Sequence, residues 1–228
     1  MIDGVIFDKD GTLFDFTSSW GGWVMGVLAH IAPSPQQHPA ILDALGFDSV
    51  ARRFHKDSVV IAGTTPQIAD VLLPLLPQLT LDQLNAILNT QAADAPMHPA
   101  VNLPAVLGAL RAKGLRLGLA TNDTEIPARQ HLARAGVGDL FDFIAGCDSG
   151  FGGKPQPGQL LAFAQMTGLD PAQIAMVGDS LHDLHAARAA GMVAIGVLTG
   201  VALRDDLAAN ADVILPDIGH IAAWLDQF

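Results

Sequence analysis

Features that mark several other protein classes are scarce in this chain of 228 residues. A single cysteine, Cys147, allows no internal disulfide, which is typical of proteins in a reducing cytoplasm. The longest apolar runs, such as residues 192–203, are too short to span a bilayer. The acidic residues Asp3, Asp8 and Asp10 are not expected in a secretory signal peptide. We therefore predict a cytoplasmic protein that has no place in a membrane.

Basic residues are also scarce. The chain has 12 lysines and arginines against 23 aspartates and glutamates, and its formal net charge is −11. Nucleic acids and anionic membrane surfaces attract proteins that carry basic patches. The composition therefore indicates no nucleic-acid partner and no membrane partner. Half of the residues are hydrophobic, which is enough to build a sizeable core.

Strand patterns and helix patterns alternate along most of the chain. The strand patterns lie at residues 3–8, 115–120, 143–146, 174–178, 193–197 and 213–215. The helix patterns between them lie at residues 103–113, 126–135, 158–167 and 183–190. Four glycines stand where these helices should end, as C-terminal caps do: Gly114, Gly136, Gly168 and Gly191. This alternation predicts an α/β fold, with a Rossmann-like parallel sheet covered by helices on both faces.

One interval, residues 16–96, lacks convincing strands. Its helical patterns lie near residues 20–31, 37–45, 65–73 and 81–92. Thr80 and Gln83 form a capping box for the last of these helices. We predict that residues 16–96 form an all-helical cap domain, inserted into a catalytic core made of residues 1–15 and 97–228.

Polar side chains follow four of the predicted strands. Asp8 and Asp10 follow the first strand, and residues 121–123 (Thr-Asn-Asp) follow the second. Lys154 lies in the loop after the third strand, and Asp179 follows the fourth. The carboxyl ends of the strands form the ligand crevice of an open parallel sheet. These distant segments are therefore expected to meet at one edge of the sheet.

The residue types at this edge indicate phosphoryl transfer. Several carboxylates cannot lie together unless they are protonated or neutralised, and oxygen-only ligands favour Mg²⁺ over zinc. Lys154 can offset the remaining charge, while Thr121 and Asn122 offer neutral donors to phosphate oxygens. One carboxylate is then free to act as a nucleophile, and a second can act as acid and then base.

The motifs resemble those of the haloacid dehalogenase superfamily, in the helical-cap branch that includes phosphoglycolate phosphatases and β-phosphoglucomutases. The first motif of that family is matched by residues 8–13 (Asp-Lys-Asp-Gly-Thr-Leu) and the hydroxyl motif by Thr121. The lysine motif is matched by residues 154–157 and the acidic motif by residues 178–183. Lys9 departs from the family, which more often has an apolar residue there. Strand alternation predicts that its side chain points away from the direction of Asp8.

The resemblance implies a role for each matched residue. Asp8 would be the nucleophile, and Asp10 would protonate the leaving oxygen and then activate water. Thr121 and Lys154 would hold the phosphoryl oxygens, and Asn122 would contribute through its backbone or its side chain.

The resemblance also implies a metal and a reaction. Asp8, the backbone carbonyl of Asp10, and Asp179 would bind Mg²⁺, and Asp183 would support the metal or the lysine. The implied enzyme is a monomeric or homodimeric phosphoglycolate phosphatase-like hydrolase of a small phosphorylated metabolite. It would work through an aspartyl phosphate. Two alternatives stay open: a β-phosphoglucomutase-type phosphosugar mutase, and a non-catalytic phosphate-binding module that shares the fold.

The predicted cap contains only three basic residues, Arg52, Arg53 and Lys56. Arg52 and Lys56 share a face if this stretch is helical. One interpretation is that at least one of these cations, with Arg52 and Arg53 as arginine candidates, reaches over the site and binds a carboxylate or a second polar group of the substrate. The other interpretation is a solvated surface cluster.

Overall fold

The computed structural model describes residues 1–32 and 34–227. Its central sheet has six parallel strands in the order β5-β4-β1-β6-β7-β8. The strands are β1 (Gly4–Phe7), β4 (Arg116–Ala120), β5 (Phe143–Ala145), β6 (Ile174–Gly178), β7 (Val193–Val197) and β8 (Val213–Leu215). Each lies within or at a predicted strand pattern, and the predicted α/β fold is confirmed.

Helices cover both faces of this sheet because successive side chains of its strands point to opposite faces. Val5 and Phe7 share a buried cluster with one helical layer, and Ile6 shares a second cluster with the other layer. The first layer is α6 (Leu103–Ala112), α7 (Glu125–Arg134) and α11 (Ile221–Leu225). The second layer is α8 (Gly158–Thr167), α9 (Leu181–Ala190) and α10 (Arg204–Leu207).

Short elements and caps complete the connections. Gly168 and Gly191 cap α8 and α9 with positive φ angles of 71° and 72°, which confirms the predicted ends of these two helices. Short 3₁₀ helices lie at Pro35–Gln37, Leu73–Leu75, Gly138–Leu140, Pro171–Gln173 and Ile218–His220.

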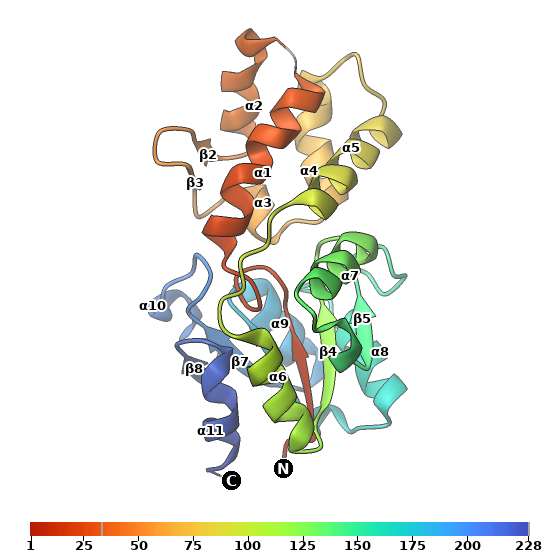
Figure 1. The fold of residues 1–228 in the computed structure, drawn as a ribbon, viewed down its shortest axis with the longest axis vertical. Helices are drawn as coiled ribbons and strands as arrows, with labels where there is room; N and C mark the ends of the chain where they lie inside the picture. The colour runs from red at the N-terminus through yellow and green to blue at the C-terminus, as the bar shows by residue number, and fades with distance from the viewer. Residues whose placement is uncertain (33, 228) are drawn as a thin grey trace.

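Residues 16–96, which we call the insert, lie between β1 and β4 in the sequence, although these two strands are neighbours in the sheet. The insert has its own buried cluster, which includes Trp23, Leu28 and Leu88. Figure 1 shows the insert above the carboxyl ends of the strands, with both termini at the opposite end of the molecule. Its helices are α1 (Phe16–Ile31), α2 (His38–Ala44), α3 (Val59–Ala62), α4 (Thr65–Leu72) and α5 (Leu81–Asp94). The separate buried cluster supports the division into core and cap, which stays a prediction.

The insert also contains one short hairpin that the sequence analysis did not anticipate. It consists of β2 (Phe47–Asp48) and β3 (Arg53–Phe54). The Asp48 carboxylate accepts two backbone N–H groups from the turn, each at 2.9 Å, and Arg52 takes a positive φ of 51°. A helix cannot continue through such a turn, so Arg52 and Lys56 do not share a helix face.

Candidate active site

Asp8 is the first residue beyond β1, and it lies at the edge of the sheet below the insert. Its backbone N–H donates to the carbonyl of Val177 in β6 at 2.8 Å. Gly11 then turns the chain with a φ of 83°. A Cβ atom at Gly11 would lie 2.4 Å from the Asp179 carboxylate, so glycine is required where these two segments meet.

Three buried carboxylates come together from separate elements. Oxygens of Asp8, Asp179 and Asp183 all lie within 4.8 Å of one another. Burial raises the pKa of Asp8 to about 7 and raises the pKa of Asp179 well above its usual range. A cation placed among these oxygens would favour their ionised forms. Because every donor is a carboxylate oxygen, the set fits a hard divalent ion such as Mg²⁺.

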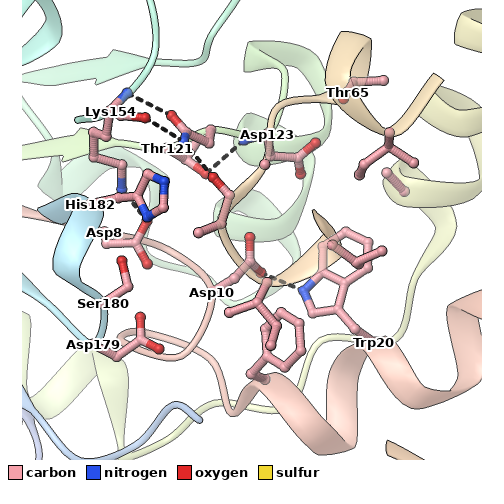
Figure 2. Close-up of a pocket in the computed structure, with 18 of the residues that line it drawn as sticks. Asp8, Asp10, Trp20, Thr65, Thr121, Asp123, Lys154, Asp179, Ser180 and His182 are labelled. Atoms are coloured by element: carbon pink, nitrogen blue, oxygen red, sulfur yellow. Dashed lines mark hydrogen bonds and ion pairs between the residues drawn. The ribbon is translucent and has the colours of Figure 1, made fainter. Parts of the chain in front are cut away.

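Lys154 is the cation that the structure itself supplies to this carboxylate cluster. Its Nζ lies 2.5 Å from Oδ1 of Asp8 and 2.7 Å from Oδ1 of Asp183, and Figure 2 shows it reaching toward Asp8. Burial opposes the charged form, but the carboxylates of Asp183 and Asp8 outweigh it and raise the pKa of Lys154. The lysine is therefore charged at neutral pH and oriented toward the predicted nucleophile.

Asn122 holds the Lys154 loop in place. Its Nδ2 donates to the carbonyls of Lys154 at 2.9 Å and of Ala62 in the insert at 2.7 Å. Its Oδ1 accepts the backbone N–H of Lys154 at 2.8 Å. Both amide hydrogens are occupied, so a contact between Asn122 and a phosphate oxygen would have to use the backbone N–H. The side chain positions the lysine and joins core to insert.

Thr121 lies at the carboxyl end of β4 and lines the pocket above Asp8. Its hydroxyl oxygen accepts the backbone N–H of Asp123 at 3.1 Å. The hydroxyl hydrogen remains able to donate, as the predicted contact with a phosphoryl oxygen requires.

A second buried lysine lies immediately after Asp8, and the sequence analysis assigned it no activity. Lys9 is fully buried. Its Nζ lies 2.8 Å from Oδ2 of Asp10, 3.3 Å from Oδ2 of Asp123 and 3.2 Å from Nδ1 of His131. The side chain turns away from Asp8, as strand alternation predicts. Burial opposes its charge, but Asp10 and Asp123 raise the pKa of Lys9 above its usual value.

Asp10 is held by protein donors rather than by the cluster of Asp8, Asp179 and Asp183. Its Oδ1 accepts from Lys9 Nζ at 2.9 Å and from Trp20 Nε1 at 2.8 Å. Figure 2 shows Asp10 between Asp8 and Trp20. The predicted metal ligand of this residue is its backbone carbonyl, and that role stays a prediction.

Sequence reasoning missed three partners of this second lysine: Trp20, Asp123 and His131. The Nε2 of His131 donates to the carbonyl of Ala92 in α5 at 2.9 Å, which leaves Nδ1 to accept from Lys9. Burial, helped by the charge of Lys9, lowers the pKa of His131 to about 4, so this imidazole is neutral at pH 7. The available signal was Lys9 itself, since a lysine at the end of a buried strand needs carboxylate partners.

The structure does not bring the basic residues of the insert to the pocket above Asp8. Arg52 and Arg53 lie in the hairpin and line a different hollow, beside Phe16. Lys56 is exposed, and its Nζ pairs with Asp206 at 3.1 Å. None of these three cations is among the described residues that line the pocket. The arrangement therefore does not favour the predicted substrate contact of Arg52 and Arg53.

Comparison with known proteins places this site in a family. The family model described as haloacid dehalogenase-like hydrolase matches residues 2–191. The chain belongs to the haloacid dehalogenase-like hydrolases. A phosphoglycolate phosphatase of Rhodospirillum rubrum is 30% identical over 234 aligned residues, which cover 99% of this chain and 91% of that protein. The predicted recognition of this family is therefore confirmed.

Solved structures of this family share the fold of the whole chain. The crystal structure of a predicted phosphoglycolate phosphatase from Haemophilus somnus has a TM-score of 0.71 at 20% identity and covers 98% of both chains. A β-phosphoglucomutase from Clostridium difficile has a TM-score of 0.69 at 16% identity, covering 100% of this chain and 96% of that one. At these identities the likeness shows the fold alone.

The chain is a hydrolase of the phosphatase type, as the resemblance predicted. Within the described residues, no helix combines the length and the apolar character that crossing a membrane requires.

Proposed function

We propose that the chain is a Mg²⁺-dependent phosphomonoesterase that acts on a small phosphorylated metabolite of the cytoplasm, through an aspartyl phosphate on Asp8. The proposal is carried by the buried contact between Lys154 Nζ and Asp8 Oδ1 at 2.5 Å, next to the carboxylates of Asp179 and Asp183. A lysine in this place can neutralise phosphoryl oxygens while Asp8 attacks with its other oxygen.

In the first step, a carboxylate oxygen of Asp8 attacks the phosphorus, and the P–O bond to the leaving alcohol breaks. The electron pair of that bond stays on the leaving oxygen, which takes a proton from Asp10. The hydroxyl of Thr121 and the ammonium of Lys154 stabilise the negative charge on the other phosphoryl oxygens. The products of this step are an alcohol and an aspartyl phosphate.

In the second step, water attacks the phosphorus of the aspartyl phosphate, and the bond to Asp8 breaks. Asp10 takes the proton of this water, so both aspartates return to their starting states and inorganic phosphate is released. The donors on Oδ1 of Asp10, Lys9 Nζ at 2.9 Å and Trp20 Nε1 at 2.8 Å, hold this carboxyl group in place between the two steps.

The residues that would hold Mg²⁺ are Asp8, Asp179 and Asp183, whose carboxylate oxygens lie within 4.8 Å of one another, together with the backbone carbonyl of Asp10. When bound, the ion supplies positive charge that orients the phosphate and offsets the charge on its oxygens. The observation that supports this assignment is the close approach of the buried carboxylates of Asp8, Asp179 and Asp183.

A mutase of the β-phosphoglucomutase type is the main alternative. It would require the insert to hold a phosphosugar and to keep water from the aspartyl phosphate. Insert side chains that line the pocket, such as Trp23, Ile61 and Ile68, are apolar and offer few partners to sugar hydroxyls. This lining favours hydrolysis. The second alternative is a regulatory module without turnover. Such a module would not need the carboxyl group of Asp10 to be held beside that of Asp8.

Phosphoglycolate, named for the Rhodospirillum rubrum relative, is the first candidate substrate to test. The experiment measures inorganic phosphate released from a panel of phosphorylated metabolites, with 4-nitrophenyl phosphate as a generic substrate. We expect release that requires Mg²⁺ and disappears in Asp8→Asn. Absence of release from every substrate by folded protein with Mg²⁺ would overturn the proposal and favour the regulatory module.

A further inference from the structure

The wall of the pocket that faces away from the carboxylates comes from the insert, and it is apolar. Thr65 and the backbone of residues 62–63 interrupt an otherwise hydrocarbon and aromatic surface. Most of these apolar side chains are buried, and Ile61 is half-buried. The larger apolar side chains of this lining include Trp20, Trp23, Val60, Ile61, Ile68 and Leu88. If phosphorus is held beside Asp8, the group attached to its leaving oxygen points toward this wall, beyond Asp10.

The charges around the pocket leave nothing to receive a second anion. The described residues that line it include five aspartates but a single lysine, Lys154, and no arginine. Lys154 already contacts two carboxylates, those of Asp8 and Asp183. His182 lies on the core side of the pocket, near Asp8 (Figure 2), rather than on the insert wall. A substrate carboxylate at the insert wall would therefore be desolvated without a cationic partner.

The basic residues of the insert cannot fill this gap in the arrangement observed. Arg52 and Arg53 line the hollow beside Phe16, and Lys56 pairs with Asp206 at an adjoining hollow that shares Ile61 and Asp179 with the pocket. The polar side chain that the insert wall does offer is neutral, the hydroxyl of Thr65. The indole N–H of Trp23, another residue of this wall, is fully buried and has no hydrogen-bond partner among the described residues.

We propose that this site takes phosphate monoesters whose leaving group is uncharged and mainly apolar, such as an aryl or short alkyl alcohol with at most a neutral hydrogen-bonding atom. This inference rests on the proposed function, since it concerns the substrate of the same site. Apolar contact with the insert wall stabilises such a group, whereas a carboxylate there loses its hydration and a sugar leaves several hydroxyls without partners. Phosphoglycolate is then a poor substrate.

The first experiment compares esters that carry a carboxylate on the leaving group with neutral counterparts. The pairs are 2-phosphoglycolate against 2-phosphoglycolamide, and 4-carboxyphenyl phosphate against phenyl phosphate. In the second pair the carboxylate-bearing phenol leaves at least as readily as phenol, so intrinsic reactivity does not favour the neutral ester there. We expect kcat/KM to be at least about tenfold higher for the neutral member of each pair, since the charged member leaves an unpaired buried carboxylate.

The outcomes separate this inference from the proposed function. Equal or faster hydrolysis of the charged member of both pairs overturns the inference while the phosphatase function stands. Hydrolysis of no ester at all overturns the proposed function, and the inference with it.

A second experiment supplies the missing cation. Ile61→Arg should raise kcat/KM for 2-phosphoglycolate about tenfold relative to 2-phosphoglycolamide, because a charged donor then faces the carboxylate. Ile61→Gln, which is polar but neutral and shorter than arginine, should not produce this gain. Ile126→Arg adds the same charge at an exposed position in α7 and should leave the ratio unchanged. If the folded Ile61→Arg protein has the same ratio of kcat/KM values for the two substrates as the wild type, the inference is wrong. The insert wall would then not determine the preference between the two leaving groups.

Discussion

Two buried lysines lie on opposite sides of the chain where it leaves β1, and each contacts two carboxylates. Lys154 contacts Asp8 and Asp183, whereas Lys9 contacts Asp10 and Asp123. The first cluster includes a further buried carboxylate, that of Asp179, and so sets three carboxylates against one lysine, whereas the second sets two against one. The second cluster is completed by neutral protein groups, the indole of Trp20 and the imidazole of His131.

The difference separates a cluster that needs a ligand from one that does not. Around Lys154, burial raises the pKa of Asp8 and Asp179 and the neighbouring carboxylates raise it further, so a metal ion bound there would favour their ionised forms. Around Lys9, every contact is made within the chain, so the cluster can hold Asp10 in place whether or not a substrate is bound. The predictions below test the two sides of this contrast, and the last one tests a part of the insert that belongs to neither cluster.

The largest effect is expected in the Lys154 cluster. Asp8→Asn removes the attacking anion and should lower kcat by at least about a thousandfold, with the fold retained because the side chains are nearly isosteric. Phosphate release and circular dichroism measure the two effects. Asp205→Asn makes the same change at an exposed position and serves as the control. Near wild-type turnover in Asp8→Asn would overturn the mechanism.

Metal removal should act on the same cluster. Treatment with EDTA should abolish phosphate release, and added Mg²⁺ should restore it. Ca²⁺ should restore little activity, because it prefers more ligands at longer distances. A metal-free enzyme, checked by elemental analysis, that retains full turnover would contradict the assignment of Asp8, Asp179 and Asp183.

The two lysines should respond differently to Mg²⁺ when each is removed. Lys9→Met leaves two buried carboxylates without their cation and should lower the free energy of unfolding by about 3–5 kcal/mol, with or without Mg²⁺. Lys154→Met should also destabilise the metal-free protein, but Mg²⁺ should recover part of this loss. Urea unfolding with and without Mg²⁺ measures both effects.

The control for these variants is Lys113→Met, which removes an exposed ion pair with Asp226. It should change the free energy of unfolding by less than about 1 kcal/mol. If Mg²⁺ stabilises Lys9→Met and Lys154→Met to the same extent, the contrast between the two clusters is wrong.

His131 should contribute to the pH dependence of stability. Its pKa is lowered to about 4 in the folded protein, from an ordinary value of 6.5, so the unfolded state binds the proton more readily. Stability should therefore be lost as pH falls from 6.5 to about 4, by roughly 2–3 kcal/mol from this group. His131→Gln should show a shallower decline in urea unfolding over that window. His98→Gln, at an exposed position, should follow the wild type.

The smallest effect is expected at the hairpin. Arg52→Ala and Arg53→Ala should each change kcat/KM by less than about twofold for every substrate, because these side chains do not line the pocket. Steady-state kinetics with phenyl phosphate and 2-phosphoglycolate provide the measurement. A tenfold loss confined to 2-phosphoglycolate would show that an arginine reaches the substrate after all.

The sheet and the Lys154 cluster were predictable because their signals are local. Apolar runs mark the strands, Gly168 and Gly191 mark helix ends, and each motif places its polar residues after a strand, either directly or in the loop and helix that follow it. Strand ends in a parallel sheet meet at one edge, which is why Asp8, Lys154 and Asp183 could be brought together from the sequence.

The Lys9 cluster and the hairpin could not be predicted in this way. His131 lies 122 positions from Lys9, in a helix whose sequence gives no sign of which face meets the insert. The Asp48 turn depends on hydrogen bonds from its carboxylate to the backbone and on a positive φ at Arg52, a conformation that arginine rarely adopts. Such contacts arise only when distant or irregular segments are placed in space.

The division of the pocket between strand ends and insert also matters for redesign. Several apolar side chains that meet the leaving group, those of Val60, Ile61 and Ile68, belong to one short stretch of chain, while the reacting groups come from other segments. A combinatorial library confined to these three positions can therefore explore new leaving groups without altering a residue assigned to the chemistry. The residues proposed to recognise the leaving group can therefore be changed without changing those proposed to carry out the reaction, by replacing one short fragment of the gene.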